Sequence, residues 1–281
     1  MLTPFTELLA EHDRAGSGLG AFTCYDLEVT AGVLSAAAER EVGVVLLISR
    51  DAFDSPSGEQ LLAAVRAAAE RSAARACVQL DHVADPTLIA RAFELGAGAV
   101  MADGSKLPFA ANVALVRETV ALARRHGGAV EAELGHIAGD EDVARAAEAG
   151  GFTDAEEARG FLGEAEPDCL AVSIGNVHGA YRHEPQLDWE RLDAIEALAS
   201  VPLSLHGASG LPEADVSRAV AAGVRKVNVN AELRAAYLDA TAAELEAARD
   251  GGRLMALHAA QRDAAAALVG AKIEAFRGAK A

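Results

Sequence analysis

The sequence is poor in basic residues, and this shortage excludes several classes of partner. Its 281 residues include 25 Lys and Arg against 42 Asp and Glu, which gives a formal net charge of −17 at pH 7. Nucleic acids and anionic membrane surfaces are bound by basic patches, so we expect neither as a partner. An anionic small molecule would need a local binding site of its own.

Cysteines and long apolar runs are also scarce. The three cysteines, Cys24, Cys77 and Cys169, are odd in number and widely spaced, which fits reduced, buried thiols rather than a disulfide framework. No run approaches the eighteen apolar residues of a membrane-spanning helix. The N-terminal segment carries acidic residues where a signal peptide needs a basic flank and an apolar stretch. We therefore expect a cytoplasmic protein.

Short apolar runs rich in Val, Ile and Leu alternate with Ala-rich segments of helical periodicity. The predicted strands cover residues 20–25, 43–49, 76–81, 98–103, 129–134, 169–175, 202–207 and 226–231. Strands buried on both faces and separated by helices predict a parallel sheet, and eight such units predict a closed (β/α)₈ TIM barrel. A doubly wound sheet is the alternative.

The chain shows no linker that would divide these units. We therefore expect one barrel domain over residues 1–281, in which residues 253–281 form an extra C-terminal helical extension. This extension either packs against the barrel or forms a subunit contact, and we expect a homodimer or homotetramer.

Polar residues interrupt the predicted strands almost entirely at their C-terminal ends, where barrel enzymes carry their catalytic groups. These residues are Thr23, Ser49, Asp81, His82, Asp103, Glu133, His178, His206, Asn228 and Asn230. The simplest interpretation of Asp81 and His82 alone is a strand-end pair, in which Asp81 caps the next helix. Their position in this series suggests chemistry instead.

Three of the strand ends carry a histidine. His82, His178 and His206 would meet at the mouth of the barrel, which suits a catalytic zinc ion with three protein ligands and an open position. Asp81 would then lie beside the ion as an acid or base toward a substrate hydroxyl. Asp103 and Glu133 either hold a second cation, divalent or monovalent, or orient the histidines.

A phosphate site is predicted after the last two strands, where barrels of this type often bind phosphate through backbone N–H groups and a helix N-terminus. Gly207 and Gly210 would let the backbone approach an anion closely, and Ser209 adds a hydroxyl group.

Several motifs together resemble a known family, in order and spacing, up to about residue 235. They are "VQLDH", "MADGSKLPF", "VEAELG", "AVSIGNVHGAYRHEP", "LSLHGASGLP" and "KVNVNAEL". They resemble the zinc-dependent class II ketose-bisphosphate aldolases, especially the tagatose-bisphosphate aldolase-like branch. The resemblance implies a lyase of carbohydrate metabolism that cleaves a fructose- or tagatose-1,6-bisphosphate-like ketose into dihydroxyacetone phosphate and an aldehyde.

The resemblance also implies individual roles. Zinc would be held by His82, His178 and His206, Asp81 would move the proton of the substrate hydroxyl, and Glu141 in "AGDED" would serve as the second acid. Substrate and phosphate contacts would come from Ser49, Gly179, Gly207, Ala208, Ser209, Asn228, Val229, Asn230 and Ala231.

Three positions depart from the family pattern. Thr23 stands where the family has Asn, Arg182 stands where it has Lys, and Ala231 replaces the usual Thr of the phosphate loop. The loss of one hydroxyl donor would weaken a phosphate contact by roughly 1–3 kcal/mol, unless Asn230 substitutes for it.

Three alternatives stay open from the sequence. A Schiff-base aldolase would have to use one of only four lysines, of which Lys226 alone lies on a predicted strand. A non-catalytic sugar-phosphate-binding accessory subunit would keep the barrel and lose the activity. A zinc hydrolase is disfavoured, because the first strand lacks a His-x-His motif.

Overall fold

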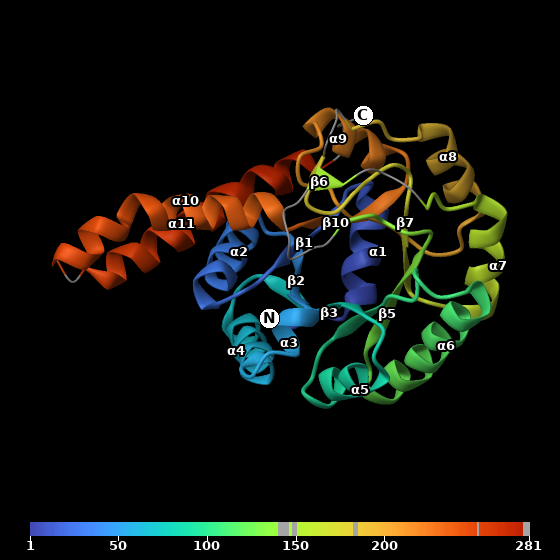
Figure 1. The fold of residues 1–281 in the computed structure, drawn as a ribbon, viewed down its shortest axis with the longest axis horizontal. Helices are drawn as coiled ribbons and strands as arrows, with labels where there is room; N and C mark the ends of the chain where they lie inside the picture. The colour runs from blue at the N-terminus through green and yellow to red at the C-terminus, as the bar shows by residue number, and fades with distance from the viewer. Residues whose placement is uncertain (140–145, 148–150, 182–184, 252, 278–281) are drawn as a thin grey trace.

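A computed structural model describes residues 1–139, 146–147, 151–181, 185–251 and 253–277. Within these residues, eight parallel strands form a closed barrel in the order β1-β10-β9-β7-β5-β4-β3-β2, which confirms the predicted (β/α)₈ fold (Figure 1). The barrel strands are β1 (Leu19–Thr23), β2 (Gly43–Ser49), β3 (Arg75–Val83), β4 (Ala99–Ala102), β5 (Ala129–Leu134), β7 (Cys169–Val172), β9 (Leu203–Leu205) and β10 (Val224–Val229). A separate two-stranded sheet joins β6 (Ala146–Ala147) to β8 (Ala180–Tyr181).

Helices alternate with the barrel strands and surround them. They are α1 (Phe5–Ala15), α2 (Leu27–Glu39), α3 (Arg50–Phe53), α4 (Gly58–Arg71), α5 (Pro86–Glu94), α6 (Phe109–His126), α7 (Ala155–Ala165), α8 (Trp189–Leu198), α9 (Glu213–Ala221), α10 (Ala231–Gly251) and α11 (Leu254–Ala275). None of the helices in the described ranges is both long enough and apolar enough to cross a bilayer.

Aspartates start several of these helices, as their sequence signals predict. Asp85 accepts a hydrogen bond from the backbone N–H of Thr87 and is followed by Pro86 in the first turn of α5. Asp188 caps α8 in the same way. Such caps satisfy N–H groups that have no partner within the helix. Since Asp85 caps α5, the interpretation of Asp81 as the cap of that helix is wrong.

The N-terminal part of the barrel interior is filled with apolar side chains and is closed by α1. Phe5, Leu8 and Leu9 of α1 join a buried cluster with Val45 and Leu47. The three cysteines are free and buried, two of them in this same cluster, as the sequence predicted. Helix α1 was not predicted. It forms because residues 5, 8, 9 and 12 place one buried stripe against the barrel.

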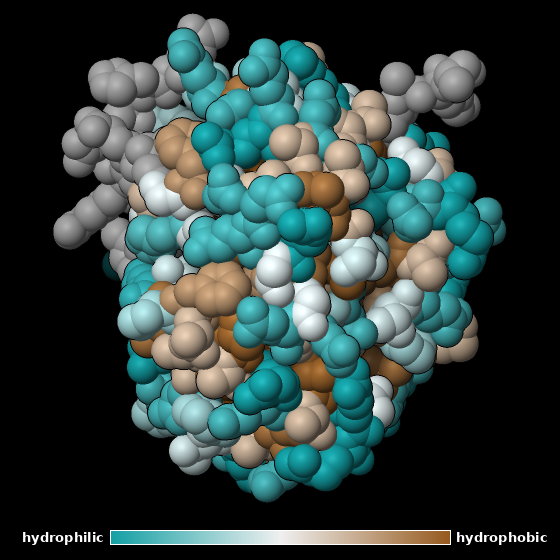
Figure 2. Space-filling model, turned by 90° about the vertical axis from the view of Figure 1, so that its right-hand side faces the viewer, coloured by the Kyte–Doolittle hydropathy of each residue, from teal (hydrophilic) through white to brown (hydrophobic). Residues whose placement is uncertain are grey.

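The outer helices bury one face against the barrel wall and expose the other. Figure 2 shows the exposed surface on the side that carries α6, α7 and α8, where hydrophilic side chains predominate and hydrophobic ones are interspersed. Apolar side chains of α6, such as Val116 and Val120, lie in the cluster between the helices and the strands. This packing fixes the strands, and with them the side chains at the strand ends.

The predicted extra C-terminal helix is α11. It pairs with α10 in a hairpin that projects from the barrel (Figure 1) and packs against α2. The approach to α2 is close: a Cβ on Gly32 would lie 2.6 Å from the carbonyl oxygen of Arg262. Whether residues 1–281 behave as one domain stays a prediction.

Candidate metal and catalytic site

Asp81 and His82 lie at a β-bulge, which explains how two adjacent strand residues serve one site. Between Leu80 and Val83 the register of β3 against β4 shifts, with three steps along β3 matched by two along β4. His82 has φ of 50°, a left-handed backbone conformation that costs about 1–3 kcal/mol for a residue with a side chain. In a regular strand Asp81 and His82 would face opposite sides. The bulge lets both line the same cavity.

The three predicted histidines come together at the C-terminal ends of the strands. The Nε2 atom of His82 lies 3.0 Å from the Nδ1 atom of His206. The ring centroids of His82 and His178 are 4.8 Å apart, and those of His178 and His206 are 5.8 Å apart. One nitrogen from each ring lies within 4.8 Å of the others, close enough for all three to ligate one ion.

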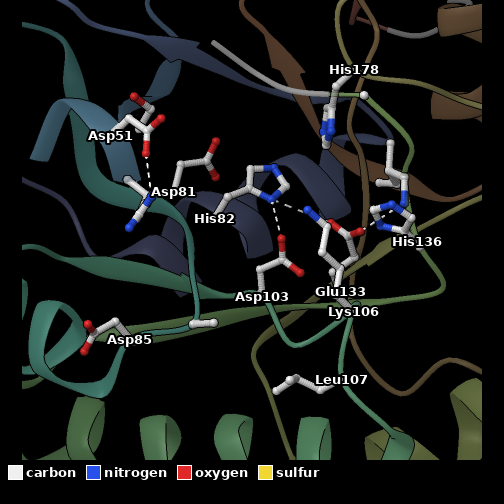
Figure 3. A pocket seen from close by; sticks show the side chains of 15 residues that line it. Asp51, Asp81, His82, Asp85, Asp103, Lys106, Leu107, Glu133, His136 and His178 are labelled. Atoms are coloured by element: carbon white, nitrogen blue, oxygen red, sulfur yellow. Dashed lines mark hydrogen bonds and ion pairs between the residues drawn. The ribbon is translucent and has the colours of Figure 1, made fainter. Parts of the chain in front are cut away.

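Two carboxylates lie beside the Nδ1 atom of His82 (Figure 3). The Nδ1 atom of His82 is 2.9 Å from Oδ2 of Asp103 and 3.8 Å from Oε2 of Glu133. These three residues form a second group with suitable ligand spacing. The Oε2 atom of Glu133 is buried and has no hydrogen-bond donor among the described residues. An acceptor buried in this way is costly unless positive charge faces it.

Burial and neighbouring charges shift the pKa values of His82, Glu133 and His206. Burial lowers the pKa of His82, but Asp81, Asp103 and Glu133 outweigh it and raise this pKa well above its ordinary value. Burial and the Asp103 charge raise the pKa of Glu133 to about 7. Burial lowers the pKa of His206 to about 4, against the opposing effect of Glu131. The pocket therefore favours positive charge next to His82 while it keeps His206 neutral.

A cavity of about 500 Å³ lies at the mouth of the barrel, and its wall includes His82 and His178 but not the fully buried His206. Its wall includes the predicted residues Ser49, Asp81, His82, Asp103, Glu133 and His178. It also includes Arg50, Lys106 and His136, for which the sequence suggested no role. Ser49 caps α3, because its hydroxyl oxygen accepts a hydrogen bond from the N–H of Ala52 at the start of that helix.

The predicted phosphate residues lie on neighbouring loops rather than in the wall of this cavity. Gly207 has φ of 62°, and a Cβ there would lie 2.0 Å from the carbonyl oxygen of Val177, so only glycine fits. Gly179 also has a positive φ, of 84°. Asn228 connects this region to the histidines, because its Nδ2 atom lies 3.3 Å from Nδ1 of His206.

The last predicted phosphate residues run from Asn228 into the start of α10 at Ala231. Val229 and Ala208 bury their side chains in the apolar core, so they offer only backbone groups. Asn230 accepts a hydrogen bond from the Tyr25 hydroxyl at Oδ1, over 2.8 Å. Glu141, the predicted second acid, and Arg182 lie outside the described residues.

Two functional candidates inside the barrel, Gln79 and Glu131, were missed at the sequence level, whereas Lys226 was considered there as the strand lysine of a Schiff-base aldolase. Gln79, Glu131 and Lys226 are all completely buried. Glu131 lies two residues before Glu133, and Lys226 lies two residues before Asn228, so both share the inward face of their strands. This alternation along the strands could have identified them as inward-facing, and charged residues that face inward are rarely buried without a partner.

A closed (β/α)₈ barrel with an imidazole cluster and paired carboxylates at its strand ends defines a class of metal-dependent barrel enzymes. Comparison with known proteins gives the family. The family described as "Fructose-bisphosphate aldolase class-II" matches residues 3–281. The chain belongs to this family and is a class II aldolase, a lyase.

Individual relatives agree. The chain is 38% identical over 234 residues to the D-tagatose-1,6-bisphosphate aldolase subunit GatY of Klebsiella oxytoca, covering 83% of this chain and 82% of that protein. The YdjI aldolase of Escherichia coli K12 superposes with a TM-score of 0.87 at 28% identity, over 98% of this chain and 97% of that one. A putative fructose-1,6-bisphosphate aldolase of Coccidioides immitis also gives 0.87 at 28% identity, over 97% and 95% of the two chains.

The family assignment also bears on the cofactor. Class II aldolases are generally zinc-dependent, and the histidine group described above offers donors of the type that zinc prefers.

Proposed function

We propose that this protein is a zinc-dependent aldolase that reversibly cleaves a ketose 1,6-bisphosphate of the fructose or tagatose type. The products are dihydroxyacetone phosphate and an aldehyde. The observation that carries the proposal is the convergence of three imidazoles within 4.8 Å beside a buried aspartate. The substrate type is taken from the tagatose-bisphosphate relative and from the family description.

The proposed zinc ligands are His82, His178 and His206. The donor set fits, because three neutral imidazoles leave the charge of the ion intact and a coordination position open. Bound there, zinc would polarise the ketose carbonyl and stabilise the negative charge that develops when the carbon–carbon bond breaks. Asp103 and Glu133 are proposed to orient His82 or to hold a second cation, for which the buried Oε2 atom of Glu133 is suited.

Asp81 is proposed as the base for bond cleavage. It is 3% exposed, and its Oδ2 atom lies 3.5 Å from the amide nitrogen of Asn228. Asp81 would take the proton from the hydroxyl on the carbon that becomes the aldehyde, and would return it in the synthetic direction. Glu141 is proposed to protonate the remaining three-carbon unit, which completes dihydroxyacetone phosphate.

The phosphate of the three-carbon unit is proposed to bind across the loops that follow β7, β9 and β10. Gly179 and Gly207 would offer backbone N–H groups, and the N-terminus of α10 would favour the negative charge. Asn230 is proposed to replace the hydroxyl donor that Ala231 lacks, since its Oδ1 accepts from Tyr25 and its amide nitrogen is a hydrogen-bond donor. Ser49, which lies across the cavity, is proposed to contact the other end of the substrate.

The Schiff-base alternative is disfavoured by the surroundings of Lys226. Its ammonium group is 2.8 Å from Glu131 and 2.6 Å from Asn228, with no exposed surface. Burial lowers the pKa of Lys226, but the Glu131 charge outweighs it and the pKa is raised. A protonated, enclosed amine is a poor nucleophile. The comparisons give no support to the accessory-subunit alternative.

The test is a cleavage assay on metal-depleted protein. Purified enzyme is treated with a chelator, assayed, supplied with zinc and assayed again, with triose phosphate as the measured product. The substrates are fructose and tagatose 1,6-bisphosphates and a panel of ketose 1-phosphates. We expect activity to disappear with the metal and to return with zinc. Turnover in chelator, or a borohydride-trapped adduct on Lys226, would contradict the mechanism; zinc binding without turnover on any ketose would favour the accessory role.

We further propose that the protein acts as a homodimer or homotetramer in the cytoplasm. The projecting α10–α11 hairpin exposes large apolar side chains, with Leu238 55% exposed and Met255 72% exposed. Exposed apolar surface of this kind is typical of subunit contacts. Light scattering on the purified protein tests the assembly size, and a monomer at micromolar concentration would contradict it.

A further inference from the structure

Beneath the three histidines, the barrel interior contains a closed ring of polar side chains that the proposed steps do not use. Lys226 Nζ lies 2.6 Å from Asn228 Oδ1 and 2.8 Å from Glu131 Oε2. Glu131 Oε1 lies 2.9 Å from His206 Nε2. His206 Nδ1 lies 3.3 Å from Asn228 Nδ2, which closes the ring. All four residues are at most 3% exposed.

The hydrogen-bonding capacities around this ring allow only one arrangement. The ammonium group of Lys226 can only donate, so Asn228 must present its oxygen to it and its NH₂ group to His206. Because Asn228 donates to Nδ1 of His206, that nitrogen carries a lone pair. The hydrogen of the neutral imidazole is therefore on Nε2, where the Glu131 carboxylate accepts it.

We propose that Lys226 and Glu131 are positioning residues for the metal site. Glu131, paired with Lys226, accepts the Nε2 hydrogen of His206 and so leaves the Nδ1 lone pair, 3.0 Å from His82, for the proposed zinc, which would take it in place of the Asn228 hydrogen bond. They also hold the Asn228 amide nitrogen toward Asp81. This inference rests on the proposed zinc-dependent function and adds the interior residues that prepare it.

The position of Gln79 makes it possible to separate this role from simple charge neutralisation. Gln79 Nε2 donates to the same Glu131 oxygen as Lys226, over 2.6 Å. The double variant Gln79→Glu/Glu131→Gln therefore keeps a carboxylate close to Lys226 and preserves the charge and the number of side-chain atoms. Only His206 loses its carboxylate partner, and an amide group takes that place.

The experiment measures the zinc affinity of full-length variants by competition with a chromogenic chelator, and the visible spectrum of bound Co²⁺ as a report on ligand geometry. Outer-shell partners of metal-binding histidines typically contribute a factor of about 10–100 in affinity. We expect Glu131→Gln, Lys226→Met and the exchanged pair each to bind zinc about 10–100-fold more weakly and to alter the Co²⁺ spectrum.

Arg225→Met is the matched control. Arg225 precedes Lys226 on β10 and also pairs with an acid, because its guanidinium group is 2.7 Å from Asp13 at the N-terminal end of the barrel. This variant loses an ion pair of the same strand without touching the ring. We expect its zinc affinity to stay within about twofold of that of the wild type, since the ring that acts on His206 is intact.

Wild-type zinc affinity and an unchanged Co²⁺ spectrum in the exchanged pair would overturn the inference, because Glu131 would then only neutralise Lys226. If Lys226→Met does not fold, Lys226→Met/Glu131→Gln removes both buried charges together, and normal zinc affinity in that protein would equally overturn it. Failure of the proposed function is distinguishable, because it appears as absent zinc binding or zinc-independent cleavage in the wild-type protein.

Discussion

Replacement of Glu133 by glutamine tests whether the site is built to hold positive charge. The Glu133 side chain is 1% exposed, and burial together with Asp103 raises its pKa to about 7, compared with an ordinary 4.5. Between these two pH values the folded protein keeps a proton on Glu133 that the unfolded chain has lost. Stability contributed by this proton is present below pH 4.5 and is lost as the pH rises to 7.

The interval between these two pKa values corresponds to about 3 kcal/mol of unfolding free energy. The assay is urea unfolding of chelator-treated wild type and Glu133→Gln, in buffers from about pH 5 to about pH 8. Glutamine has no proton to lose, so the stability of the wild type relative to the variant should fall by most of this amount across the range. Comparison with the variant cancels the titration of groups that do not interact with Glu133, and the difference includes the coupling of Glu133 to His82 and Asp103.

Zinc should abolish this decrease, because a bound cation favours the ionised carboxylate. Glu59→Gln is the control. Glu59 pairs with Arg91 on the surface, and this hydrogen bond lowers the pKa of Glu59. The stability of the wild type relative to Glu59→Gln should therefore not fall as the pH rises. A flat difference between the metal-free wild type and Glu133→Gln would refute the reasoning, since Glu133 would then titrate as an ordinary carboxyl group.

Three further outcomes are expected. His82→Ala should lose zinc binding and turnover together. Asp81→Ala should keep its zinc affinity within about threefold and lose at least about 100-fold in kcat, as expected for a proton-transfer group. The control His126→Ala, at a surface histidine, should change neither zinc affinity nor kcat, and full activity of Asp81→Ala would remove Asp81 from the mechanism. Gly207→Ala would place a Cβ 2.0 Å from the carbonyl oxygen of Val177, so KM for the phosphorylated substrate should rise about tenfold or more, as steady-state kinetics will check. Gly32→Ala would place a Cβ against the α11 backbone and should lower unfolding free energy by about 1–3 kcal/mol without affecting zinc binding, as denaturant titration will show.

The barrel could be predicted because its signals are local and repeated. Each strand is a short apolar run between helical segments, and the structure places a barrel strand within or across every predicted run. The histidine cluster was predictable for the same reason, because parallel strands of a barrel bring their C-terminal ends to one mouth. His82, His178 and His206 needed only their positions after the strands to be grouped.

The geometry that makes the cluster effective was not predictable. Strict alternation along β3 would direct Asp81 and His82 to opposite faces, and it is the bulge with φ of 50° at His82 that brings them to one cavity. Strain of this kind is imposed by tertiary contacts and leaves no local sequence signal. The ring of Lys226 and Glu131 was missed because strand parity predicts which residues face inward but not which of them meet.

An acidic protein can bind an anionic substrate if the groups that contact the substrate act at short range. Around the cavity, five carboxylates at residues 51, 81, 85, 103 and 133 face only Arg50 and Lys106 as permanent cations among the described lining residues. A net charge of −17 cannot attract a sugar phosphate from a distance. In the proposed function, binding would therefore depend on short-range contacts: backbone N–H groups beside glycines of positive φ, the N-terminus of α10, and a cation held against His82. The same proposal accounts for the carboxylates around His82, because they would favour a bound cation there and so add positive charge beyond that of Arg50 and Lys106.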